Sequence, residues 1–304
     1  MVFIFALFSG AVPLHWPLSA EEKFILFRLR FPRVLLGGMV GGALALSGAV
    51  LQILFINPLA EPYILGISGG AALGGILALL LGINLSGLGV TLGAFGGALF
   101  ALAILFFIIG IKGELDTYFF LLAGVILNAL FTAIILFISA LVKASALHTI
   151  YFWLLGDLST AGFTEVGWMS FFVLICGLVC LYHARTLDAM AQGEVVAATL
   201  GISVGRAKRQ LLLVMSLLVG ATVAVSGMIG FVGLVVPHGI RLLAGNQHRT
   251  TLPLCFCTGA GFLILSDAIA RRVFAPLEMP VGVITALLGA PFFLYLLRTY
   301  VKNR

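Results

Sequence analysis

One four-residue segment of this chain has the form of a catalytic motif. Gly66-Ile67-Ser68-Gly69 has the G-x-S-G pattern seen at the nucleophile of intramembrane serine proteases. Such a serine needs a base, usually histidine, within hydrogen-bond reach of its hydroxyl. Of the five histidines, only His183 and His238 fall within the predicted spans described below. Because so short a match arises easily in a chain with 37 glycines, we do not expect an enzyme.

The residues that could bind metal or nucleotide do not form a recognisable site either. The four cysteines all lie in apolar runs, without the paired spacing of a zinc site, and are expected to pack as small hydrophobic residues. Carboxylates and histidines in the apolar runs are limited to Asp267 and scattered histidines, so no metal site is predicted. No G-x-x-x-x-G-K-[ST] sequence is present, so we expect no cofactor on this chain and no ATP hydrolysis by it.

The composition predicts a protein of the lipid bilayer. Of 304 residues, 62% are hydrophobic and only 9% are charged, against roughly 25% charged residues in soluble domains. The mean hydropathy is +1.22. The net charge of +6 comes from few residues, and no basic stripe is large enough to bind nucleic acid. The apolar runs are continuous rather than alternating, which favours membrane-spanning helices over a barrel.

These runs predict an all-α polytopic fold of about ten spans, forming one transmembrane domain over residues 1–304. The predicted spans are 2–14, 34–56, 63–82, 88–111, 117–141, 165–184, 210–228, 229–245, 252–272 and 281–300. The first is short for a span. The most polar connection, 188–206 with its flanking residues, contains a short predicted helix at Glu194–Leu200 that Gly201 would end.

An internal repeat is visible in the sequence. Ala45–Gly48 resembles Ala224–Gly227, and in each copy a proline, Pro58 or Pro237, follows the serine by 11 residues. The ten-span topology makes the two copies run in opposite directions. Inverted repeats are typical of transporters, whose transport path lies between the two copies.

Several longer motifs are distributed along the chain: Arg30–Arg33, Ser47–Gln52, Asn57–Pro62, Tyr63–Ala71, Leu122–Val125, Gly193-Glu194, Leu200-Gly201, Gly227–His238, Leu277–Gly282 and Leu288–Pro291. Together these motifs resemble the FecCD/BtuC family, the permease subunits of binding-protein-dependent ABC importers for iron chelates, haem and cobalamin. They cover about residues 28 to 298. The N-terminus departs from the pattern, because it is short for the family.

The resemblance implies a role for particular residues. Three would lie at a cytoplasmic gate: Asn57, Leu59 and Thr117. Polar residues of the fifth span would line the transport path, although each could equally form helix–helix hydrogen bonds: Asn128, Thr132 and Ser139. The segment 188–206 would couple the permease to the ATPase, chiefly through Glu194, Ala197, Leu200 and Gly201. Arginines at the outer face would dock the binding protein, with an Asp267–Arg271 pair within one helix as the competing role: Arg30, Arg33 and Arg271.

The resemblance also implies the partners. It predicts a homodimer in the cytoplasmic membrane, a pair of cytoplasmic subunits that bind ATP, and an extracytoplasmic substrate-binding protein. The cargo would be a ferric siderophore, haem or cobalamin, which the sequence alone does not distinguish. A secondary transporter or a metal-ion permease is the alternative reading. Direct coordination of a bare ion suits the spans less well than a weakly interacting path for a bulky chelate.

Overall fold

The computed structural model describes residues 1–10, 12, 17–83, 88–109, 117–273, 275 and 277–302, and all its elements in these ranges are helical. In chain order they are α1 (Val2–Phe8), α2 (Ala20–Phe24), the π-helix η1 (Ile25–Arg30), α3 (Phe31–Leu54), the 3-10 helix η2 (Pro62–Leu65), α4 (Ile67–Leu80), α5 (Gly89–Ile109), α6 (Thr117–Leu141), α7 (Ala144–Leu154), α8 (Phe163–Tyr182), α9 (Ala184–Met190), α10 (Glu194–Thr199), α11 (Val204–Ser226), α12 (Val232–Ala244), α13 (His248–Arg272) and α14 (Val281–Lys302). The predicted all-α fold is therefore confirmed.

Each of the ten predicted spans corresponds to a helix, and among the described residues one helix of more than seven residues lies outside these spans and was not predicted. Within the described residues, six helical stretches are long and apolar enough to cross a membrane, and α4, α12 and α14 are shorter apolar helices. The first span was predicted too long, because α1 ends at Phe8. Its seven residues extend only about 10 Å, a third of the hydrocarbon thickness. The unpredicted helix is α7, which lies between α6 and α8 in the chain.

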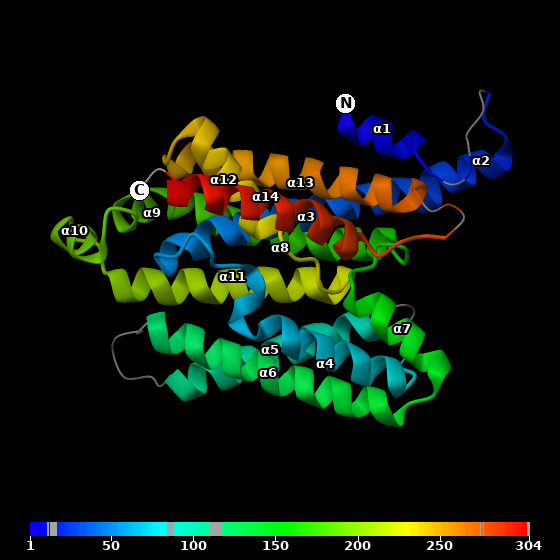
Figure 1. Ribbon diagram of the computed structural model, residues 1–304, viewed down its shortest axis with the longest axis horizontal. Helices are drawn as coiled ribbons and strands as arrows, with labels where there is room; N and C mark the ends of the chain where they lie inside the picture. The colour runs from blue at the N-terminus through cyan, green and yellow to red at the C-terminus, as the bar shows by residue number, and fades with distance from the viewer. Residues whose placement is uncertain are drawn as a thin grey trace.

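The long helices lie along one axis in two groups with α11 between them (Figure 1). One group contains α3, α8, α12, α13 and α14, and the other contains α4, α5 and α6; α11 contacts both groups. The short helices α9 and α10 lie at one end of the long axis, and α2 lies at the other (Figure 1). We call these the α10 end and the α2 end.

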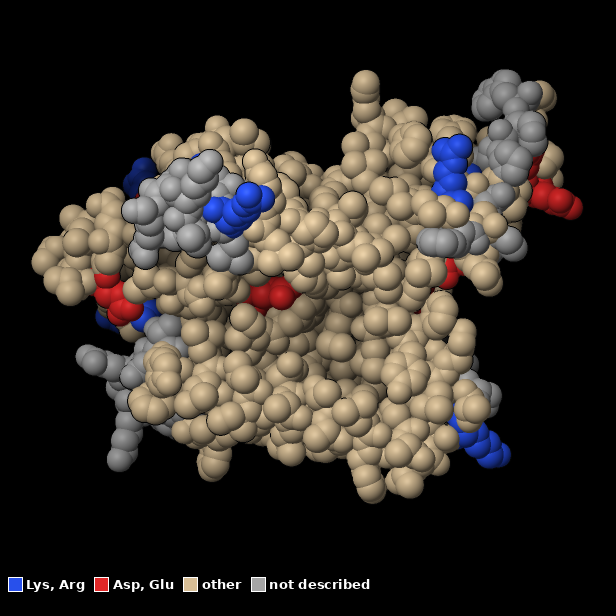
Figure 2. All heavy atoms as spheres, viewed as in Figure 1, with Lys and Arg blue, Asp and Glu red and all other residues tan. Residues whose placement is uncertain are grey.

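Charge is distributed as a membrane-spanning chain requires. On the face shown in Figure 2, lysine, arginine and acidic side chains gather near the two ends of the long axis, and the belt between them is almost free of charge apart from one acidic patch near its middle. Large apolar side chains on this belt are exposed, especially along α6, where Phe119, Ile126 and Phe137 are more than half exposed. Such a surface is stable only against lipid or another apolar surface.

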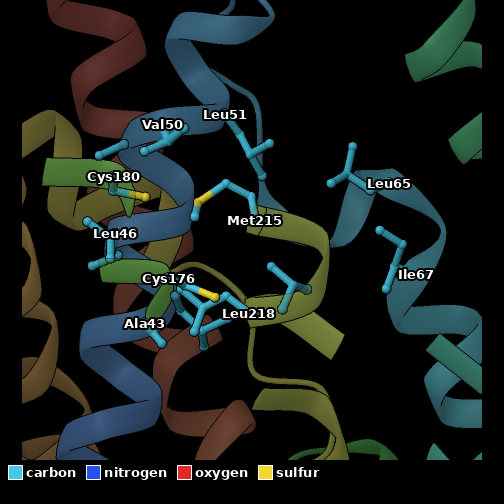
Figure 3. Packing of buried hydrophobic residues seen from close by; sticks show 14 of the residues in the cluster. Ala43, Leu46, Val50, Leu51, Leu65, Ile67, Cys176, Cys180, Met215 and Leu218 are labelled. Carbon is cyan, nitrogen blue, oxygen red and sulfur yellow. The ribbon is translucent and has the colours of Figure 1, made fainter. Parts of the chain in front are cut away.

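The core forms where α3, α8 and α11 meet (Figure 3). Leu46 and Leu51 of α3 lie near Met215 and Leu218 of α11, and Cys176 and Cys180 of α8 belong to the same cluster. Three of the four cysteines are buried and Cys257 is exposed; all four are free. The cysteines of α8 therefore pack as small hydrophobic residues, as predicted.

Glycines bring the backbones of α3 and its neighbours into direct contact. A β carbon at Gly48 would overlap the carbonyl oxygen of Gly233 in α12, and one at Gly41 would overlap that of Gly259 in α13. Between helices in lipid, such small residues allow close backbone packing. The crossing at Gly48 places α12 beside the end of α3 that leads into residues 55–66.

The two copies of the predicted repeat run in opposite directions along α3 and α11 (Figure 1). Their ends differ, however. Gly48 lies inside α3, whereas Gly227 ends α11 with a φ of 65°. Pro58 lies in the break after α3, and Pro237 lies inside α12. The similarity is therefore restricted to the helices, because the second copy breaks its helix earlier than the first.

Candidate functional site

The segment 188–206 folds around a short exposed helix at the α10 end. Gly193 and Gly201, with φ of 116° and 80°, adopt backbone conformations that favour glycine and flank α10. This agrees with the predicted helix at 194–200. Ala197 is fully buried, whereas Leu200 is 67% and Val195 is 79% exposed. The helix therefore presents Val195 and Leu200 outward and uses Ala197 to pack on its own chain.

One ion pair and one aspartate–histidine contact hold this segment on the bundle. Lys208 Nζ of α11 lies 2.6 Å from Glu194 Oε1, and the lysine side chain is 5% exposed. On α9, Asp188 Oδ1 accepts the backbone N–H of His248 at 2.8 Å and lies 2.7 Å from the ring Nδ1 of that residue. Glu194 therefore faces α11, and α9 and α10 are tied to the first turns of α13 and α11.

Of the predicted gate residues, Asn57 lies near this segment, because it lines one cavity together with Met190 and Ala191. Asn57 Oδ1 accepts the backbone N–H of Leu59 at 2.9 Å, which closes a tight turn after α3. Leu59 is 45% exposed, and Ile56 has a φ of 48°, a conformation rare for a β-branched residue. The backbone of Thr117 begins α6, but its side chain lies outside the described residues.

The break after α3 is bonded to the break between α11 and α12. Glu61 Oε1 accepts the backbone N–H of Phe231, the N-cap residue of α12, at 2.6 Å. The hydroxyl oxygen of Tyr63 accepts the backbone N–H of Ile229 at 2.6 Å. Phe231 has a φ of 69°, so its backbone is strained and depends on its neighbours. Burial raises the pKa of the Glu61 carboxyl, and the hydrogen bond from Phe231 opposes the rise.

We expect Glu61→Ala to destabilise the protein by about 1–2 kcal/mol, because the part-buried backbone N–H of Phe231 would lose its acceptor. Glu61→Gln keeps an oxygen that can accept the N–H of Phe231, so its loss should be smaller. Unfolding of the purified protein in an SDS titration measures both. A Glu61→Ala protein as stable as the wild type would show that the carboxylate does not hold α12.

The three predicted path residues lie on one side of α6 but in different surroundings. A β carbon at Gly69 of α4 would lie 2.5 Å from Asn128 Oδ1, so this amide is packed against α4. Thr132 is exposed, and its hydroxyl donates to the carbonyl of Asn128 at 2.7 Å. Ser139 is buried. The contact of Asn128 is of the helix–helix kind, and a path-lining role for these residues stays a prediction.

The three predicted docking arginines lie near the α2 end, where their guanidinium groups have partners within the chain. Arg33 is paired with Asp267 at 2.9 Å and with Glu278 at 2.7 Å. Arg271 is paired with Asp267 at 3.0 Å and donates to the carbonyls of Ala6 and Ser9. Arg30 donates to the carbonyls of Leu7 and Val12. Arg30 and Arg271 therefore anchor the last turn of α1, where positive charge is favourable. The predicted Asp267–Arg271 pair is present.

Asp267 is the carboxylate shared by two of these arginines, and its side chain is only 3% exposed. We expect Asp267→Asn to destabilise the protein by about 3–5 kcal/mol, because the buried Arg271 loses the carboxylate paired with it and Arg33 loses one of its two carboxylate partners. The matched change Glu278→Gln removes a carboxylate that is 44% exposed and should cost less than about 1 kcal/mol. The same SDS titration compares the two. Equal losses would mean that burial does not set the strength of this network.

Comparison with known proteins identifies the architecture. The profile of the FecCD transport family matches residues 1–299. The chain belongs to the FecCD transport family. It is 42% identical to the hemin transport system permease protein HmuU of Yersinia pestis, over 95% of this chain and 88% of that protein. It is 41% identical to the cobalamin import system permease protein BtuC of Halobacterium salinarum, over 95% and 77%.

A solved structure extends this result to the arrangement of helices. A metal-chelate type ABC transporter in an inward-facing conformation superimposes with a TM-score of 0.89 at 32% identity, covering 98% of this chain and 95% of that one. PsaBC from Streptococcus pneumoniae, at 19% identity and a TM-score of 0.61, shares the fold alone. This FecCD chain is thus a multi-pass membrane protein and an ABC importer permease.

The structure also adds residues that sequence reasoning missed. Lys208, Asp188 and His248 hold the segment 188–206 on the bundle, and Val195 is the most exposed apolar side chain of that segment. Glu61 and Tyr63 join the two helix breaks. Glu61 and Tyr63 lie in the motifs Asn57–Pro62 and Tyr63–Ala71. Their roles depend on contacts with residues about 170 positions further along the chain, which the sequence does not reveal.

Proposed function

We propose that this chain is the permease of an importer that moves an iron chelate, haem or cobalamin into the cytoplasm. It acts as a homodimer of single-domain subunits in the cytoplasmic membrane. Two separate subunits hydrolyse ATP, and an extracytoplasmic binding protein delivers the cargo. The observation that carries the proposal is the match over residues 1–299, together with relatives whose names specify hemin and cobalamin transport.

The cytoplasmic gate is proposed at Asn57, Leu59 and Thr117, with Asn128, Thr132 and Ser139 along the path. The turn that Asn57 closes supports this assignment, since it leaves Leu59 exposed, and Asn57 lines a cavity with Met190 of the coupling segment. No group of three or more potential metal ligands occurs among the described residues. A path with little affinity for the cargo is consistent with release after transport.

Coupling to the ATPase is proposed through Glu194, Ala197, Leu200 and Gly201, each in a different role. Leu200, together with Val195, contacts the ATPase. Ala197 lets α10 pack closely on its own chain, Gly201 ends the helix, and Glu194 fixes it to Lys208. Movement of α10 would therefore reach α11 directly, and α11 ends at the break that meets Glu61 and Tyr63.

Docking of the binding protein is proposed at the α2 end, where Arg30, Arg33 and Arg271 lie. These three side chains are held by partners within the chain. They therefore contribute to docking by setting the local structure and the positive charge of this end, and not by extending outward to contact the binding protein. Arg28 and Arg272 are the neighbouring exposed arginines. Charges at the rim of an interface give orientation and association rate more than affinity.

The test is co-expression with the ATPase and binding protein encoded nearest to this chain. ATP hydrolysis is then measured in proteoliposomes with binding protein that is empty or loaded with haem, cobalamin or a ferric siderophore. Stimulation by one loaded form would identify the cargo. Failure to form a complex with an ATPase would contradict the proposal and favour the secondary transporter or metal-ion permease.

A further inference from the structure

A cavity of about 240 Å³ opens at the α10 end, between the break after α3 and the end of α9. Its polar lining comes from Gln52, Asn57 and Arg241, and its apolar lining includes Ile53 and Met190. The role proposed for the gate and coupling segment leaves Gln52 and Arg241 without a function. The chemistry of these three side chains indicates what the cavity can bind.

Gln52 fixes the position of Arg241. Its side chain is 3% exposed, and its amide nitrogen donates to the carbonyls of Gly233 at 3.2 Å and Ala60 at 3.5 Å. The amide oxygen of Gln52 accepts a hydrogen bond from a terminal nitrogen of Arg241. These hydrogen bonds fix the orientation of the buried Gln52 amide. The amide in turn holds the guanidinium group of Arg241 at the cavity wall.

The cavity offers hydrogen-bond donors while its side-chain acceptors are occupied. Arg241 forms no ion pair in the part of the chain that the structure describes, and only one of its five N–H groups has a partner there. Asn57 Oδ1 is used by the N–H of Leu59, which leaves the amide N–H groups of Asn57. The backbone oxygens of Gln52 and Ile53 accept from Asn57 and Ile56. Arg241 is only partly exposed, and a partly buried guanidinium group that has no carboxylate partner favours the binding of an anion.

We propose that Arg241, Asn57 and Gln52 form a binding site for a phosphate-type oxyanion at the α10 end of the permease. A tetrahedral oxyanion carries acceptors only, and a guanidinium group can bind two of its oxygens at once. The source is either a phospholipid headgroup or free phosphate. Because the site joins α3, α12 and the end of α9, its occupant would stabilise the contact between the gate turn and the coupling segment.

The experiment uses the full-length permease in nanodiscs. Discs of phosphatidylcholine alone are compared with discs that also contain phosphatidylglycerol, and inorganic phosphate is titrated into the former. Native mass spectrometry measures lipid retained, and thermal unfolding measures stabilisation by phosphate. Retention of phosphatidylglycerol over phosphatidylcholine assigns the site to the headgroup, and stabilisation by phosphate alone assigns it to the free anion.

Variants test the residues. Arg241→Gln should weaken binding of the effective anion about tenfold or more, since hydrogen bonds to charged groups are lost. Arg249→Gln, at an exposed arginine near the start of α13, should change it less than about twofold. Arg241→Gln could also weaken the fold by releasing Gln52. Asn57→Asp avoids this, because it keeps the acceptor for Leu59 and supplies a carboxylate of its own beside Arg241, which should exclude the anion.

The proposal is overturned if the wild-type protein neither retains phosphatidylglycerol over phosphatidylcholine nor is stabilised by phosphate. It is also overturned if Asn57→Asp, or a folded Arg241→Gln protein, binds the anion as tightly as the wild type. The site does not depend on which cargo is carried, so these results are separate from those of the transport assay.

Discussion

Replacing Leu200 with aspartate is expected to abolish productive contact with the ATPase and to reduce transport at least about 100-fold. Leu200 is 67% exposed at the end of α10, in a position that a partner would cover. An unpaired carboxylate buried in such an interface costs several kcal/mol, and apolar anchors at the centre of an interface dominate its affinity. The measurement is co-purification of the ATPase, followed by transport in proteoliposomes.

The matched control is Arg249→Asp, at the same end of the bundle but on α13. It introduces the same carboxylate at an exposed site in the first turn of a helix, where negative charge is tolerated. Its ATPase should co-purify normally. Glu194→Gln should differ from both, binding the ATPase but coupling it poorly, because Lys208 no longer fixes α10. Normal coupling in Leu200→Asp would place the ATPase contact elsewhere.

The α10 region shows what could be predicted from the sequence. The helix and its end at Gly201 were predicted, because caps and glycine conformations depend on neighbouring residues. The span positions were predicted for the same kind of reason, since apolar length is a local property. What could not be predicted is the direction in which α10 faces. Ala197 turns inward and Val195 outward because α10 packs against α9 and α11, which lie outside the motif.

For the arginines at the α2 end, most of the contacts could not be predicted from the sequence. A sequence pattern marks Arg30 and Arg271 as charges near helix ends, and charges there are ordinarily expected to face solvent. Their partners are backbone carbonyls of residues 6–12, up to 265 residues away, which no spacing rule identifies. The Asp267–Arg271 pair was predictable because it is four residues apart on one helix. The addition of Arg33 to that pair, from α3, was not.

Gly48→Ala is expected to disrupt the α3–α12 crossing and to cost about 3 kcal/mol or more, although it adds one methyl group. The new β carbon would overlap the carbonyl oxygen and the Cα of Gly233, which belong to backbone and cannot rotate away. Ordinary overpacking costs about 1–3 kcal/mol because side chains yield, so a backbone clash should reach or exceed the upper end. Separation of the helices would also break the hydrogen bond from Gln52 to Gly233.

The control for Gly48→Ala is Gly96→Ala, in a position of α5 where an added β carbon meets nothing within 4 Å. That change should stabilise its helix slightly, by about 0.5–1 kcal/mol, because alanine favours helix over glycine. Unfolding in an SDS titration compares the two, and the yield of monodisperse protein provides a second measure. Because the same substitution then has opposite signs at two glycines, the difference reports backbone contact rather than helix propensity. A Gly48→Ala protein as stable as Gly96→Ala would mean that α3 and α12 can separate freely, and the joined breaks at Glu61 and Tyr63 would then not depend on this crossing.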